Sequence, residues 1–67
     1  MRTDRVEVSW DGTKSKWLIR IVAGEEAVRR YSDVQKDVDE PTLRAAAQKI
    51  TQEEGYESDP AEIVIRR

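Results

Sequence analysis

Apolar and polar residues alternate over residues 5–10 and again over residues 16–23, which is typical of two half-buried strands. Asp11-Gly12 between them marks a turn, so we expect the two segments to form a hairpin. A connection of two, four or six residues places both apolar sets on one face, and a connection of six residues would pair Trp10 with Trp17. These sets are Val6, Val8 and Trp10 in the first segment, and Trp17, Ile19 and Ile21 in the second.

A third strand is predicted over residues 27–32, after a turn at Gly24-Glu25 or at residues 24–26. The pattern does not decide which of its side chains face the core, because two adjacent arginines interrupt the alternation. We favour the register in which Tyr31 faces the core and Arg29 lies at the rim, where its aliphatic stem can cover apolar surface. That register places Val28 and Arg30 on the opposite face, whereas the other would turn Arg30 inward.

The spacing of residues 39–56 predicts the main helix of the chain. Asp39 is expected as the N-cap, with its carboxylate accepting bonds from the first turn, and Pro41 fits that turn because it needs no donor there. Gly55 is expected to end the helix in a left-handed conformation. Four residues at helical spacing form one apolar stripe, which needs a sheet to pack against: Leu43, Ala46, Ala47 and Ile50.

A short fourth strand over residues 61–66, with Ile63 and Ile65 inward, completes a β-β-β-α-β order. The predicted fold class is therefore α+β: one two-layer domain over residues 1–67, with a mainly antiparallel four-stranded sheet and one helix on one face. A right-handed crossover brings the last strand parallel to the first, and we expect the sheet order 3-2-1-4. The expected core is Val6, Val8, Trp10, Trp17, Ile19, Ile21, Leu43, Ala47, Ile50, Ile63 and Ile65.

Composition narrows the chemistry of these 67 residues. The chain has no cysteine and no histidine, which removes thiolate metal sites and the commonest general base at neutral pH. The carboxylates of residues 33–40 do not have the spacing of a calcium loop, so they are interpreted as a solvated loop. We therefore expect no enzymatic activity, no metal and no cofactor.

Charge and hydropathy bear on partners and location. Residues 1–32 carry a net charge of +2 and residues 33–67 carry −4, which is far from the strongly basic footprint of a dedicated nucleic-acid binder. No apolar run is long enough to span a membrane, and the first residues do not form a secretory signal. The expected location is cytoplasmic.

One helix can cover only one face of the sheet, so the other face is the candidate binding surface. We expect apolar side chains rimmed by arginines there, a pattern typical of an interface. The predicted function is a small interaction module that binds a protein partner or a second copy of itself through this face; the alternative is weak nucleic-acid binding by the same face. The candidate partner-binding residues are Leu18, Arg20, Val22, Val28 and Arg30.

The order of elements over residues 5–54 resembles two DNA-binding families. The run Trp17-Leu-Ile-Arg-Ile, and Tyr31 followed by the alanine-rich helix, are similar to plant ethylene-response-factor domains and to arm-binding domains of tyrosine-recombinase integrases. In those families the sheet face opposite the helix enters the major groove. The resemblance implies DNA contacts from Arg5, Lys16, Arg20 and Arg30. This chain departs from both families in its net acidity, in Glu7 at the centre of that face and in its fourth strand.

Overall fold

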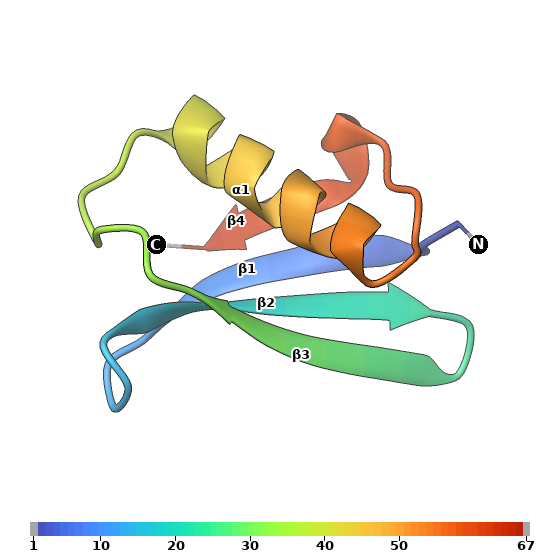
Figure 1. Cartoon of the computed structure of the whole chain (residues 1–67), viewed down its shortest axis with the longest axis horizontal. Helices are drawn as coiled ribbons and strands as arrows, with labels where there is room; N and C mark the ends of the chain where they lie inside the picture. Colours follow the sequence, from blue (N-terminus) through green and yellow to red (C-terminus); the bar gives the residue numbers. More distant parts are fainter. Residues whose placement is uncertain (1, 67) are drawn as a thin grey trace.

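The computed structural model describes residues 2–66, which form a four-stranded mixed sheet with one helix on it (Figure 1). The sheet order is β3-β2-β1-β4, with β4 parallel to β1 and the other pairs antiparallel, as the sequence predicted. Within residues 2–66 no helix is both long enough and apolar enough to cross a bilayer. In chain order the elements are β1 (Arg5–Asp11), β2 (Lys16–Ala23), β3 (Glu26–Ser32), α1 (Glu40–Glu53), the 3₁₀ turn η1 (Pro60–Glu62) and β4 (Ile63–Arg66).

The hairpin of β1 and β2 has the predicted register. Trp10 lies opposite Trp17, and their rings meet edge to face with centroids 5.4 Å apart. Glu7 lies opposite Arg20 on the other side of the sheet, where Arg20 Nη1 donates to Glu7 Oε1 at 3.0 Å. The apolar residues of both strands therefore share the helix side, which confirms the parity argument.

The predicted facing of β3 is wrong. Gly24 and Glu25 alone form the turn, so Ala23 pairs with Glu26. Two residues further along each strand, Ile21 pairs with Val28. Val28 and Arg30 therefore lie on the helix side. Tyr31, placed inward by the sequence, lies on the opposite face with Arg29 and Ala27. The two-residue turn decides this, because one residue more or less in a turn reverses every side chain of the strand.

The helix begins at Glu40 and ends at Glu53, with Asp39 at the N-cap and Gly55 in the left-handed region at φ 86°. The Asp39 carboxylate makes no capping bond, contrary to expectation. The buried stripe also differs from the expected one. It consists of Leu43, Ala47 and Thr51, whose hydroxyl donates to the Ala47 carbonyl at 2.8 Å.

The core lies between α1 and the sheet. Its buried apolar side chains are Val6, Val8, Trp17, Ile19, Ile21, Leu43, Ala47 and Ile63. Three residues expected in the core, Trp10, Ile50 and Ile65, are only partly buried but pack against it. Val28, Val34, Val38 and Tyr56 also pack there and close the sides of this small core.

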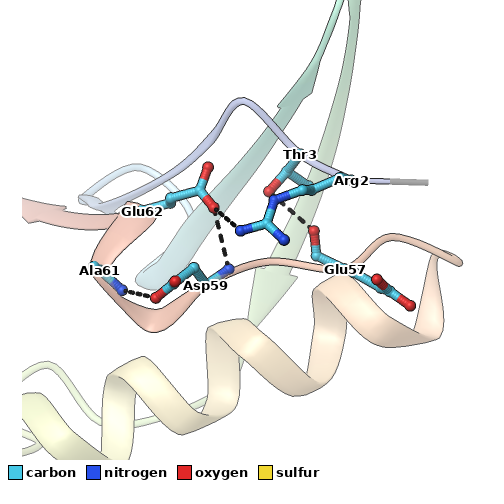
Figure 2. A network of polar contacts seen from close by, with 6 residues as sticks. All are labelled: Arg2, Thr3, Glu57, Asp59, Ala61 and Glu62. Carbon is cyan, nitrogen blue, oxygen red and sulfur yellow. Dashed lines mark hydrogen bonds and ion pairs between the residues drawn. The ribbon is translucent and has the colours of Figure 1, made fainter.

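The N-terminal segment is held against the connection between α1 and β4 (Figure 2). Thr3 is buried, and its backbone N–H donates to the Glu57 carbonyl at 2.9 Å. Arg2 Nη2 lies 3.3 Å from Glu62 Oε1, and Asp59 Oδ1 accepts the backbone N–H of Ala61 at 2.9 Å. These contacts fix the start of β4 beside β1.

Candidate partner-binding surface

The side of the sheet turned away from α1 is here called the open face. It is formed by alternate residues of each strand, and the registers arrange them in rows across the sheet. One row is Arg66, Ser9, Leu18 and Tyr31, and the next is Val64, Glu7, Arg20 and Arg29. A third row contains Arg5, Val22 and Ala27. No helix of residues 2–66 covers this face.

Glu7 is the electrostatic centre of the open face. Its carboxylate lies 3.0 Å from Arg20 Nη1, 3.4 Å from Arg5 Nε and 3.8 Å from Arg66 Nη2, and its side chain is only 21% exposed. One carboxylate thus lies within ion-pair distance of three guanidinium groups, of which those of Arg5 and Arg66 belong to mostly exposed side chains. Three arginines beside one glutamate leave an excess of positive charge at this point.

Arg29 differs from the other arginines of the open face. Its side chain is exposed and has no carboxylate within ion-pair distance among residues 2–66. Lys16, by contrast, lies 3.1 Å from Asp33. Arg29 therefore presents a hydrated guanidinium with all of its donors available to an incoming group.

The apolar side chains of the open face do not form the contiguous set that the sequence predicted. Leu18 and Val22 are half-buried, and the row that contains Glu7 and Arg20 separates them. Val22 lies opposite Ala27. Val64, 44% exposed, lies on the far side of Glu7.

Tyr31 is the aromatic residue of the open face. It lies opposite Leu18, and Lys14 Nζ lies 4.7 Å from the centroid of its ring. A cation over an aromatic ring is attracted by the ring quadrupole. The half-buried tyrosine beside Arg29 gives this end of β3 both apolar and charged surface, and tyrosine and arginine are residue types enriched at protein interfaces.

The charge difference between the open face and the rest of the chain is larger than the difference between residues 1–32 and 33–67. The strands place five basic residues, Arg5, Lys16, Arg20, Arg29 and Arg66, and two acidic ones, Glu7 and Asp11, on the open face. The strand residues of this face thus carry a net +3. Because the whole chain carries −2, the remainder carries −5. A basic face on an acidic body creates a dipolar surface that orients charged partners.

The structure brings only part of the predicted site together. Leu18, Arg20 and Val22 lie on the open face, whereas Val28 and Arg30 lie on the helix side. There Arg30 Nη1 lies 2.6 Å from Glu54 Oε2 and its Nη2 lies 3.8 Å from Glu53 Oε1.

Arg29 and Tyr31 were missed as site residues. The signal that could have found them is Gly24-Glu25 itself, because a glycine at the first central position favours a two-residue hairpin turn. Of the arginines and lysine implied by the DNA-binding resemblance, Arg5, Lys16 and Arg20 lie on the open face and Arg30 does not.

The acidic segments have no geometry of a metal site in the described chain. Asp33, Asp37, Asp39 and Glu40 are exposed, and among residues 2–66 no three carboxylates gather around one point. Residues 2–66 enclose no cavity.

The pKa of Tyr56 is raised above 10.0 by desolvation and by its hydrogen bond to Glu26, where Tyr56 Oη donates to Glu26 Oε2 at 3.2 Å.

Searches against protein-family models, curated proteins and solved structures gave no significant match to this chain. The open face must therefore be interpreted from its own chemistry.

Proposed function

We propose that this chain is a non-enzymatic interaction module that binds an acidic protein partner on its open face. The observation that carries the proposal is the charge separation: a net +3 on the strand residues of one sheet face, against −5 on the rest of the chain. Complementary potentials steer encounter and fix orientation. Tyr31 and Leu18 supply the apolar contact area that a purely electrostatic surface would lack.

A nucleic acid is the second candidate, because the same basic residues could contact phosphates. The arrangement of Glu7 favours a protein instead. Its carboxylate, at the centre of the face, would meet the phosphate backbone, and it already neutralises part of the charge of Arg5, Arg20 and Arg66. Nucleic-acid binders typically present a strongly basic patch or stripe to the phosphates.

A peptide-display selection on the immobilised chain tests the proposal. Arg29→Glu serves as the subtraction target, because it reverses one exposed and unpaired charge of the open face. We expect the retained peptides to be rich in Asp and Glu, and their affinity to fall as salt rises. Chemical-shift mapping with a selected peptide is expected to perturb Leu18, Arg29 and Tyr31.

Lys49→Glu is the matched control, since it makes the same charge change at an exposed helix position. It should leave binding unchanged. Selection of the same peptides by Arg29→Glu, or shifts confined to α1, would overturn the proposal. Duplex DNA and single-stranded RNA of about 20 nucleotides, a length that exceeds a typical single-strand site, form the other arm. Tight, salt-dependent binding there with no acidic peptide retained would replace the protein partner by a nucleic acid.

A further inference from the structure

β3 forms one rim of the sheet, and no other strand within residues 2–66 pairs with its outer side (Figure 1). It pairs with β2 over seven consecutive residues without a bulge. Proteins usually protect such an edge with a bulge, a proline, a very short strand or charged side chains. β3 has no bulge and no proline but carries the charged residues Glu26, Arg29 and Arg30, whereas β4 at the opposite rim has only four residues.

The turn before β3 determines which backbone groups point outward. Gly24 has φ 62°, and Ser15 is the only non-glycine residue of the described chain with positive φ, so Glu25 has negative φ. This combination defines a type II′ turn, in which the two flanking residues form a hydrogen-bonded pair. Pairs in an antiparallel ladder alternate between bonded and non-bonded.

Ala23 and Glu26 form a hydrogen-bonded pair. Because bonded pairs alternate along the ladder, the backbone groups of Val28 and Arg30 also form hydrogen bonds with β2. Ala27, Arg29 and Tyr31 occupy the non-bonded positions, so their N–H and C=O groups point away from the sheet. The side chains of these three residues lie on the open face. Arg29 thus contributes both an outward-pointing backbone edge and an unpaired guanidinium on the open face.

We infer that the partner binds as an extended acidic segment that adds an antiparallel strand to β3. The inference rests on the proposed function and specifies its geometry. Residues of an added strand that bond to β3 lie directly opposite Ala27, Arg29 and Tyr31, and their side chains lie on the open face. Acidic residues at these alternate positions meet the basic face.

The residues between them face the helix side of the sheet, where the local charge is different. Arg30 is already held by Glu53 and Glu54, and Val28 is partly buried there. An acidic side chain at this position would be repelled by the two glutamates, so an apolar residue fits. The partner segment therefore alternates acidic and apolar residues over about the length of β3.

A nine-residue peptide of alternating Glu and Val tests the inference. Three N-methyl groups are placed either on Glu nitrogens or on Val nitrogens. Only the Glu nitrogens face β3, so methylation there should weaken binding by at least roughly tenfold, because several hydrogen bonds are lost together. Methylation on Val should change binding by less than about threefold on the same reasoning. A shuffled peptide of equal charge should bind more weakly than the alternating one.

Amide hydrogen exchange gives an independent measure. In the free protein the amides of Val28 and Arg30 should be protected and those of Ala27, Arg29 and Tyr31 should exchange fast. The peptide should slow the second set. Ala27→Pro removes one outward N–H without breaking the ladder, so it should remain folded and lose binding, while Ala27→Ser should retain it.

Two outcomes would overturn the inference and leave the proposed function standing. One is peptide binding that shifts Leu18 and Tyr31 without protecting the outward amides. The other is equal weakening by both methylation patterns. Protection of the outward amides that rises with protein concentration in the absence of peptide would show instead that a second copy occupies the edge. Failure of the alternating peptide and of every displayed acidic peptide to bind would overturn both.

Discussion

Ile19 and Leu18 are neighbours in β2 with opposite surroundings, and the pair tests the facing of the strand. Ile19 is fully buried between the sheet and α1, whereas Leu18 is half-buried on the open face. Ile19→Ala should lower the free energy of unfolding by about 2–5 kcal/mol, through lost transfer energy and a cavity. Leu18→Ala should cost clearly less. Urea unfolding followed by tryptophan fluorescence measures both, and equal losses would contradict the described facing.

Tyr56 provides a second prediction at the scale of one residue. Its pKa is raised above 10.0 by desolvation first and by the hydrogen bond to Glu26 second. The folded state therefore retains the phenol proton more tightly than the unfolded state. Its contribution to stability is fully present below 10.0 and is lost as the pH rises through the raised pKa.

The Tyr31→Phe background isolates this titration, because the chain has only two tyrosines. Absorbance near the phenolate band should then show a midpoint above the ordinary value, and Glu26→Gln should lower it. A midpoint that Glu26→Gln leaves unchanged would exclude the carboxylate as a cause.

Residue facing was predictable wherever the alternation was regular. That Trp10 and Trp17 share a face follows from parity alone, because any even connection gives the same face, whereas their direct pairing also needs the six-residue connection. Tyr31 was not predictable in this way, since Arg29-Arg30 hides the alternation and the turn length was open. Thr51 was missed as a member of the buried helix stripe because threonine is a polar residue type. Its methyl group is buried and its hydroxyl is satisfied within the helix by the Ala47 carbonyl.

At the scale of the element, β3 places its two adjacent arginines, Arg29 and Arg30, on opposite faces of the sheet. Arg30 connects the strand to the end of α1 through Glu54, at 2.6 Å, and is 38% exposed. Arg30→Ala should therefore lower the free energy of unfolding by about 0.2–1 kcal/mol, the range for a solvent-screened pair, and leave binding of the acidic peptide nearly unchanged.

Arg29→Ala should show the reverse behaviour. It removes no ion pair of the described chain, so stability should change by no more than about 0.5 kcal/mol, while peptide binding should weaken. Thermal melting and fluorescence anisotropy on the two variants separate the effects. Loss of binding in Arg30→Ala, with Arg29→Ala unaffected, would show that β3 faces the other way.

Element positions were predictable to a larger extent than their local chemistry. The helix and its glycine stop followed from the apolar stripe and Gly55. The place of β4 beside β1 agrees with the sheet order that the sequence favoured but did not determine. The capping bond of Asp39 did not, because a suitable residue at the N-cap does not ensure the side-chain rotamer. Tertiary contacts determine such details.

At the scale of the whole molecule, the charge distribution bears on self-association. The sequence predicted either a protein partner or a second copy of the chain on the uncovered face. In the structure that face carries a net +3 on its strand residues, so two open faces repel each other. The acidic remainder of a neighbouring molecule attracts the same face, but such a heterologous contact does not close into a dimer.

We therefore predict weak, open-ended attraction between monomers at low salt and none at physiological salt. Static light scattering should give a negative second virial coefficient at about 10 mM salt, where the Debye length is near 30 Å, and a value near zero or above at about 150 mM, where it is near 8 Å.

Leu18→Ser combined with Val22→Ser should not alter this salt-dependent attraction, because charge is its cause. Arg20→Glu combined with Arg29→Glu should weaken the attraction, since it removes the basic face. A discrete dimer that persists at high salt and dissociates in the Leu18→Ser, Val22→Ser variant would contradict the prediction, and would show that apolar contacts on the open face outweigh the repulsion between its arginines.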